Sequence, residues 1–505
     1  MNFIATHLLS LILFTPAVAA VVMLLLPRPS NVFLRWFAFA ASLIPFVLSI
    51  VLWIQFRPDA AGFQFEEQYE WYAALGSTLH LGVDGLSLTM VFLTTLLTPL
   101  AILASFGITD RVKPYMMLFL LLETGMLGVF LALDLLIFFV FWEFGLVPMY
   151  FLINQWGSAN KDYASLKFMI YTMGGSLGLL LGIQLLGALF GTFDIATIAS
   201  KWTAAEGLLL GFPVATVKAV VFWGFVIAFA VKVPVWPVHT WLPDAHTEAP
   251  TAGSMILAGV LLKLGAYGFL RLVLPLYPAE ARHFAIGLAV LATAAIVFGA
   301  LASYGQGDFK RLVAHSSVNH MGFVVLGIAA AALASGTADA RIALNGAILQ
   351  MFNHGLSAAG MFFLVGVLYD RAHTRNLDEF GGLYAILPIY GGILVFTSMA
   401  SLGLPGLNGF VSEFLVVRGT FPILTPFTAI SMLGLLFTGA YILKGIKQVL
   451  HGPLNEHWSH GEHKLTEIKP REIVVMAPLM ALMLVIGVWP AWILDVINKA
   501  VLHLF

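Results

Sequence analysis

The chain has 505 residues, of which 60% are hydrophobic and only 10% are charged. A soluble protein of this length needs far more polar surface, so the composition predicts a polytopic membrane protein. The net charge of −1 gives no reason to expect nucleic-acid binding. The absence of cysteine excludes disulfides, cysteine-ligated iron–sulfur clusters and covalent c-type haem.

Apolar runs long enough to cross a bilayer, with about 20 residues each, follow one another along the whole chain. They lie near residues 8–26, 34–56, 85–106, 115–133, 134–153, 165–190, 217–238, 251–274, 284–304, 311–332, 343–369, 386–417, 424–445 and 473–496. The first lacks the basic n-region of a signal peptide, so we expect it to be retained. The pattern predicts an all-α polytopic membrane protein with about 14 transmembrane helices.

The connections between these runs indicate an orientation. The connections after the first, third and every other odd-numbered run carry about twice as many Lys and Arg residues as the remaining connections. Loops rich in Lys and Arg usually lie on the inner side of a membrane. This distribution predicts that both termini lie on the outer face of the membrane. The longest polar stretch, near 452–471, is too short to fold alone, so we expect no soluble domain.

Two runs contain helix breakers. One carries Lys232, Pro234 and Pro237, and the other, SLGLPGLNGFVSEF, carries Pro405 and Gly406. Proline removes an amide donor and glycine loosens the helix, so both runs are predicted to be discontinuous. Paired broken helices in two halves of a transporter indicate an internal repeat with an ion path at the breaks. Proline kinks without any function are the alternative.

Four charged residues lie deep within the apolar runs: Glu143, Lys232, Lys263 and Glu413. Each costs roughly 2.5–3.5 kcal/mol at the bilayer centre on insertion scales, and such residues mark ion pathways more often than not. Structural ion pairs that lock helices together are the alternative. Burial disfavours a charged lysine and a nearby carboxylate favours it. The hypothesis is that Glu143 and Lys232 form a switchable pair, with Lys263 as the next proton carrier.

Three further titratable residues lie in apolar surroundings. His320 and His354 can pass a proton between their two ring nitrogens, although a core histidine bonded to a carbonyl is an equally good interpretation of each alone. Glu123 is either a side branch of the relay or a helix-packing contact.

Neither histidine-rich segment predicts a metal site. His239, Asp244, His246 and Glu248 match no metal-ligand spacing, so the segment 239–254 is interpreted as a polar cap that joins two helices. The histidines between residues 451 and 463 are not expected to form a functional site. Neither GxxxxGK[ST] nor a strand followed by GxGxxG is present, so ATP-driven transport and nicotinamide binding by this chain are not expected.

The segments VKVPVWPVHTWLPDAHTEAPTAGSMILAGVLLKLGAYGFLR, DFKRLVAHSSVNHMGF, NHGLSAAGMFFLVGVLYDRAHTR and SLGLPGLNGFVSEF strongly resemble the antiporter-like membrane subunits of respiratory complex I. The resemblance runs from about residue 80 to the end. It implies two inverted five-helix repeats, roughly 115–238 and 251–417, between N-terminal helices in 1–114 and C-terminal helices in 418–505.

The resemblance also implies a function. Glu143 and Lys232 match the paired switch of a proton path, Lys263 the link, His320 and His354 the middle relay, and Glu413 the outlet. The implied function is proton translocation within an NADH–quinone oxidoreductase of a bacterial inner membrane, beside neighbouring antiporter-like subunits. NADH, FMN, iron–sulfur clusters and quinone are then expected on partner subunits. Multi-subunit cation/proton antiporters and membrane-bound hydrogenases share the core motif and are the alternative; a purely structural membrane scaffold is a third hypothesis.

Overall fold

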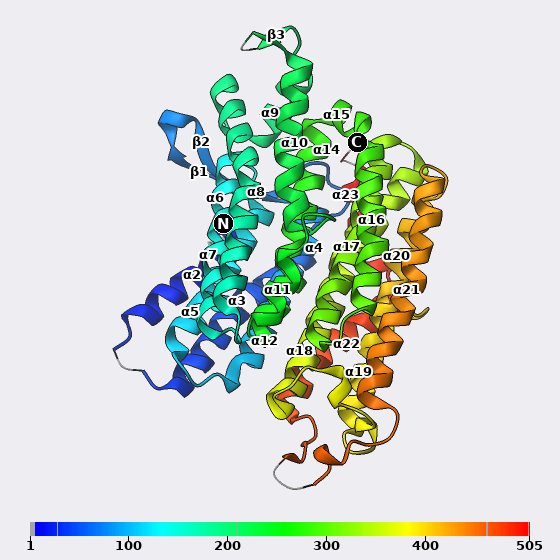
Figure 1. The fold of residues 1–505 in the computed structure, drawn as a ribbon. Coiled ribbons are helices and arrows are strands. Elements are labelled where there is room, and N and C mark those ends of the chain that lie inside the picture. The colour runs from blue at the N-terminus through cyan, green and yellow to red at the C-terminus, as the bar shows by residue number, and fades with distance from the viewer. Residues whose placement is uncertain (1–5, 28, 210, 461–462, 503, 505) are drawn as a thin grey trace.

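Helices make up most of the structure, a computed structural model that describes residues 6–27, 29–209, 211–460, 463–502 and 504 (Figure 1). The N-terminal part contains three helices, with a β-hairpin before the third. These elements are α2 (Leu8–Leu25), α3 (Asn31–Gln55), β1 (Gln64–Tyr72), β2 (Ser77–Val83) and α4 (Gly85–Ala104).

The first half continues through helices of very different lengths. They are α5 (Val112–Leu131), α6 (Leu135–Phe144), α7 (Leu146–Trp156), α8 (Lys161–Phe190), α9 (Ile195–Thr203), α10 (Val214–Lys232) and α11 (Trp241–Glu248). A second, very short hairpin formed by β3 (Leu208–Leu209) and β4 (Phe212–Pro213) projects from the bundle before α10 (Figure 1).

The second half begins with a helix that contains two π-helical segments. It comprises α12 (Thr251–Ile256), η3 (Leu257–Leu261), α13 (Leu262–Gly268), η4 (Phe269–Val273) and α14 (Leu274–Leu276). The remaining helices are α15 (Pro278–His283), α16 (Ala285–Tyr304), α17 (Phe309–Leu333), α18 (Ala338–Ala372), α19 (Pro388–Leu402), α20 (Asn408–Thr420), α21 (Thr425–Leu450), α22 (Pro470–Val488) and α23 (Ala491–Leu502).

Thirteen of the described helices are long and apolar enough to cross a membrane. The broken pair α19 and α20 stands where the sequence predicts one more span. Central helices such as α18 are buried along their apolar window, whereas α8 and α21 are buried over only about a third of theirs. The outward face of α8 exposes Leu166, Ile170, Leu177 and Leu181, a continuous apolar surface that fits lipid rather than water. The all-α polytopic membrane fold is confirmed.

Both predicted helix breaks are present. The α10 helix ends at Lys232, two residues before Pro234, and the Trp241 indole donates a hydrogen bond of 2.8 Å to the carbonyl of Val231. The freed backbone acceptor is therefore paired inside the protein, as a membrane interior requires. The second break lies between α19 and α20, where Gly403 and Gly406 have φ angles of 83° and 94° that favour glycine.

The ends of the bundle differ in charge. One end, called here the basic end, is where α17 begins and α18 and α21 end, with Lys310, Arg371, Lys444 and Lys447 (lower part of Figure 1). The β1–β2 hairpin, α9 and α15 lie toward the other end.

The chain ends themselves, residues 1–5, 503 and 505, lie outside the described part, as do residues 461 and 462 of the histidine-rich segment.

The β1–β2 hairpin is a structural element that the pattern of apolar runs does not predict. Its Glu67 is buried and accepts a hydrogen bond from the backbone N–H of Leu9 at 2.7 Å, which places a carboxylate at the N-terminus of α2. Asp134, between α5 and α6, accepts hydrogen bonds from the amides of Leu136 and Ile137 and caps α6. The hairpin and the turn are joined because Asp134 also accepts from Ser77.

A polar cluster beside this hairpin predicts a pH effect. His80 lies 3.3 Å from Asp194, the N-cap of α9, and 3.0 Å from Glu66. The hydrogen bond to Asp194 raises the pKa of His80 despite its partial burial, and the same bond lowers the pKa of Asp194 to about 2. The contribution of His80 to the free energy of unfolding is therefore fully present below the unfolded pKa of about 6.5, and it is lost as pH rises through the folded pKa. The contribution of Asp194 to the free energy of unfolding is lost only as pH falls through about 2.

We expect the amides of residues 64–83 to be more protected from hydrogen exchange at pH 6 than at pH 9, after correction for intrinsic exchange. The difference should be at most about 1 kcal/mol, or roughly fivefold, because the cluster is partly exposed. Mass spectrometry of the purified protein measures it. In His80→Gln the difference should disappear; an unchanged difference would assign it to other groups.

Candidate functional site

Lys232 lies at the first helix break, with only 2% of its surface exposed. Its Nζ atom is 4.8 Å from the centre of the Trp142 ring, and it has no hydrogen-bond partner among the described residues. Glu143 directly follows Trp142 in α6, so it lies on the helix that Lys232 contacts. Glu143 and Lys232 do not form a direct ion pair in this structure, and their role as a switchable pair remains a prediction.

Lys263 is carried by α13, between the two π-helical segments of its helix. It is fully buried, and π-helical turns within α-helices occur frequently at functional sites. Its Nζ atom donates a hydrogen bond to the carbonyl of Ala258 and lies 2.8 Å from Nδ1 of His354. The lysine therefore connects α13 directly to α18.

The row continues from His354 to Glu413 across three helices. The rings of His354 and His320 have centroids 5.6 Å apart, and Nδ1 of His320 lies 2.8 Å from Oε1 of Glu413. All three side chains are buried. The structure brings Lys263, His354, His320 and Glu413 together into one row, although they come from four helices that are distant from one another in the sequence.

Polar side chains hold Glu413 at the second break. Gln350 donates a hydrogen bond of 3.1 Å to the same Oε1 atom, and Ser412 donates to Gln350 at 2.5 Å. Gly403, which directly follows the last residue of α19, lies close to Glu413. A Cβ atom added at Gly403 would be 3.2 Å from Oε2 of Glu413. The carboxylate is therefore oriented both by its neighbours and by the interruption of the helix.

Tyr441 on α21 is a member of the site that sequence reasoning missed. Its hydroxyl lies 3.1 Å from Nε2 of His320, so both ring nitrogens of this histidine have partners. A tyrosine in an apolar helix is indistinguishable from core packing in the sequence alone.

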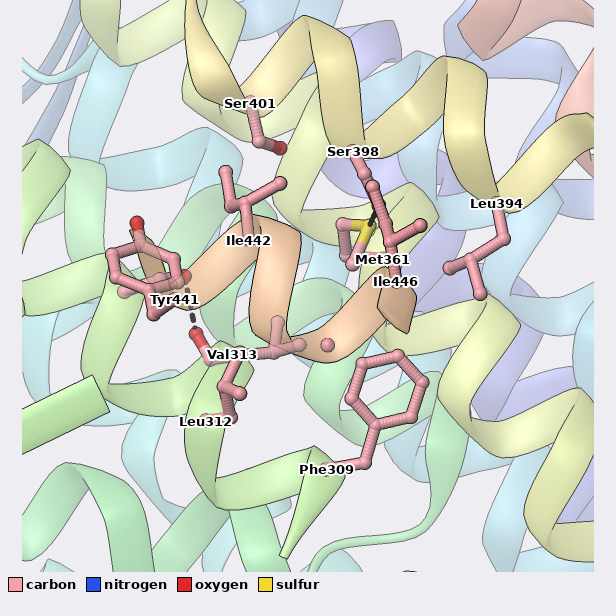
Figure 2. A pocket seen from close by; sticks show the side chains of 12 residues that line it. Phe309, Leu312, Val313, Met361, Leu394, Ser398, Ser401, Tyr441, Ile442 and Ile446 are labelled. Carbon is pink, nitrogen blue, oxygen red and sulfur yellow. Dashed lines mark hydrogen bonds between the residues drawn. The ribbon is translucent and has the colours of Figure 1, made fainter. Parts of the chain in front are cut away.

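A small cavity adjoins Tyr441 between α17, α18, α19 and α21 (Figure 2). Its volume is about 20 Å³, and roughly 10–15 Å³ is enough for one water molecule. Figure 2 shows Tyr441 and Ser401 on one side of it and Phe309 and Leu394 on the other. The cavity places water-sized space beside Tyr441, whose hydroxyl contacts His320.

Glu123 lies apart from this row. It is fully buried on α5, and neither carboxyl oxygen has a hydrogen-bond partner within the described ranges. Its assignment as a side branch of the relay remains a prediction. The segment 239–254 folds largely as α11, where Asp244 pairs with Lys167 at 2.7 Å and with Arg311 at 3.2 Å. This agrees with a polar cap that ties α8 and α17 to the first break.

Gly265 determines how closely α10 and α13 approach. A Cβ atom there would lie 2.7 Å from the carbonyl oxygen of Phe229 and 3.0 Å from Cβ of Lys232. The absence of a side chain thus brings the helix of Lys263 against the backbone next to Lys232.

We expect Gly265→Ala to separate these helices and to cost about 1–3 kcal/mol, as overpacking of a filled core does. Less of the variant protein should accumulate in the membrane, and it should unfold at a lower temperature in detergent, measured by immunoblot of membrane fractions and by a thermal unfolding assay. Gly174→Ala on α8 is the matched control, because nothing lies within 4 Å of a Cβ there. Equal behaviour of the two variants would contradict this account.

Comparison with known proteins places the chain in a family. Residues 132–438 match the family described as NADH:quinone oxidoreductase/Mrp antiporter, TM. NADH-quinone oxidoreductase subunit M of Rhodobacter capsulatus is 41% identical, with 99% of this chain and 96% of that protein covered. The subunit M of Pseudomonas aeruginosa is 40% identical over 93% of this chain and 91% of that protein.

Solved structures give the same result. A chain of respiratory complex I from Thermus thermophilus superposes with a TM-score of 0.83 at 26% identity, covering 98% of this chain and 99% of that chain. A chain of the Mrp complex from a Dietzia species has a TM-score of 0.82 at 23% identity, and 52% of that chain is covered, so it shows a shared fold alone. The chain belongs to the family of antiporter-like membrane subunits of NADH–quinone oxidoreductase.

Proposed function

We propose that this chain translocates protons as a membrane subunit of an NADH–quinone oxidoreductase. The observation that carries the proposal is the buried row Lys263–His354–His320–Glu413. Hydrogen bonds of 2.8 Å join Lys263 to His354 and His320 to Glu413, and the two histidine rings lie 5.6 Å apart between them. Titratable side chains in contact at membrane depth can accept and release protons in sequence, whereas a scaffold has no need for them.

In this proposal Lys232 receives a proton under the influence of Glu143, and Lys263 accepts it next. The proton then passes through His354 and His320 to Glu413, where the break between α19 and α20 opens the helix. Several buried polar atoms along the row, among them Nε2 of His354 and Oγ of Ser317, lack a partner in the described part of the chain. Buried polar groups usually bond to protein or to ordered water, so these atoms support a hydrated path.

The proposed orientation follows the distribution of basic residues, with the basic end on the inner side and both termini outside. The repeats at about 115–238 and 251–417 and the flanking helices at 1–114 and 418–505 complete the proposal, since each repeat then contributes one broken helix. NADH, FMN, iron–sulfur clusters and quinone are assigned to partner subunits, and electron transfer there drives the relay.

Affinity purification through a tag on this chain tests the proposal. We expect it to co-purify NADH-oxidising, quinone-reducing activity. In liposomes the complex should form a pH gradient upon addition of NADH and quinone, and a protonophore should abolish that gradient. Co-purification with small antiporter subunits and no NADH oxidation would favour the cation/proton antiporter instead.

A further inference from the structure

Arg271 is a buried charge that the row does not include. It lies eight residues after Lys263 on the same helix, toward the end of the bundle opposite the basic end. Arg271 is only 5% exposed, and its Nη2 atom lies 2.6 Å from Oδ2 of Asp84, the N-cap of α4. The guanidinium is also 4.9 Å from the centre of the Phe63 ring. A buried ion pair is weak evidence for stability, so its place in line with Lys263 needs another reason.

Tyr267 stands between the two charges, four residues from each, and is fully buried. Its hydroxyl donates a hydrogen bond of 3.0 Å to the carbonyl of Phe130 and accepts one of 3.1 Å from Nε of Arg271. Oγ of Ser87 lies 2.9 Å from the same hydroxyl and accepts from Nη2 of Arg271 at 3.3 Å. The single proton of Tyr267 is on Phe130, so Ser87 is the donor to Tyr267. The four side chains Asp84, Ser87, Tyr267 and Arg271 are called here the Arg271 cluster.

The hydrogen bonds of the Arg271 cluster form a chain that cannot carry a proton inward. Arginine stays protonated in proteins, so Arg271 cannot accept a proton at one end of the chain. At the other end the chain stops at the backbone carbonyl of Phe130, which has no proton to pass on. Within the described residues, every buried side-chain polar atom of the cluster has a hydrogen-bond partner, so none of these atoms needs ordered water.

The two sides of the cluster differ in their polar surroundings. On the side opposite the basic end lies a cavity of about 100 Å³, lined by Asp84, Arg271 and the half-exposed Lys499 among others. Roughly 10–15 Å³ is enough for one water molecule, so water can reach Arg271 there. On the inner side, Lys263 contacts His354, whose Nε2 atom lacks a partner among the described residues. The cluster therefore separates a water-sized cavity from a row with unsatisfied polar atoms.

We propose that the Arg271 cluster is a seal that keeps protons of the outer side from entering the row at Lys263. This inference rests on the proposed proton-translocating function and orientation, because a relay conserves energy only if protons cannot return by a shorter way. Protons then leave at Glu413 and do not flow back at Lys263. The fixed charge of Arg271 contributes twice: it takes up no proton, and it repels an approaching cation, as arginine does in selective pores.

Passive proton flux tests the seal. Purified complex is reconstituted into liposomes that contain a pH-sensitive dye, and a potassium gradient with valinomycin drives protons without NADH. Arg271→Gln removes the charge but keeps a hydrogen-bonding group. We expect its passive flux to exceed the wild-type flux roughly tenfold, equivalent to a barrier lower by about 1.4 kcal/mol. Arg271→Lys keeps the charge and should remain as tight as the wild type. NADH oxidation with a soluble acceptor matches the amounts of complex.

A second variant guards against a folding defect. Arg271→Gln leaves Asp84 buried without its cation, whereas Arg271→Gln/Asp84→Asn removes both charges and leaves none unpaired. The double variant should leak as much as Arg271→Gln. Arg418→Gln is the matched control, because Arg418 forms an ion pair of 2.9 Å with Asp339 at the same end of the bundle but is half-exposed. It should not leak.

The path of the leak gives the deciding result. Adding Lys263→Ala to Arg271→Gln should return the passive flux to the wild-type level, because the proposed seal protects that lysine. Wild-type flux in both Arg271→Gln and Arg271→Gln/Asp84→Asn would overturn the inference, as would a leak that persists without Lys263 or one of equal size in Arg418→Gln. These results leave the proposed function standing. That function fails separately if the wild-type complex forms no pH gradient with NADH and quinone.

Discussion

Replacing Lys263 by alanine is expected to lower NADH-driven proton pumping by roughly a hundredfold, the scale at which a positioned proton carrier acts. The substitution removes the contact of 2.8 Å to His354, a hydrogen bond that joins the α13 helix to the histidines of the row. Acidification of everted vesicles measures pumping, and NADH oxidation with a soluble acceptor reports assembly. Lys232→Ala should behave similarly, because it removes the group beside the first break.

The control for both lysines lies on the same helix as Lys232. Lys218 is near the start of α10 and donates hydrogen bonds to the carbonyls of Thr203, at the end of α9, and of Ala205. Lys218→Ala deletes the same charge outside the row and should leave pumping at the wild-type rate. Normal pumping and assembly in Lys263→Ala would instead assign the buried lysines to a structural role.

The second large effect concerns stability. Arg371 at the end of α18 and Glu472 at the start of α22 form a two-point ion pair of 2.6 and 3.2 Å, with each side chain about 10% exposed. Removing one partner of a buried pair leaves an uncompensated charge and costs about 3–5 kcal/mol. Arg371→Met is therefore expected to loosen α22 and to reduce the amount of assembled complex severely.

The double variant Arg371→Met/Glu472→Met distinguishes this charge effect from a loss of packing. Replacing both members of a buried pair by apolar residues is often neutral or stabilising, so assembly should recover largely. Thermal unfolding of the detergent-purified complex provides the measurement. If the double variant is as defective as Arg371→Met, the pair is not the cause, and the hydrogen bonds of Arg371 to Thr466 and Glu467 become the explanation.

Much of the architecture could be predicted from local sequence. Apolar runs of sufficient length predict helices because a bilayer leaves the backbone no other way to satisfy its hydrogen bonds. The breaks at Pro234 and at Pro405–Gly406 were predicted for the same local reason. The β1–β2 hairpin was not, since its acidic residues 66–70 lack the apolar alternation of a half-buried strand, and its fold depends on Glu67 capping α2 and on Asp134.

The candidate residues were identified by their depth and by family resemblance, but their connections were not. The predicted pair Glu143–Lys232 forms no direct ion pair, whereas Lys263 and His354 are in contact across 91 positions of sequence. Tyr441 gave no signal, because an aromatic ring in an apolar helix is most simply interpreted as packing. Its role depends on which helix faces it.

By itself, then, the sequence determined that this protein lies in a membrane, where its helices run and break, and which charges remain buried. These properties follow from transfer energies and backbone constraints, which act on each segment separately. Only the tertiary structure decided that Lys263, His354, His320 and Glu413 form one row. Hydrogen bonds of 2.8 Å between helices depend on packing, such as the close approach at Gly265, and no local pattern encodes that distance.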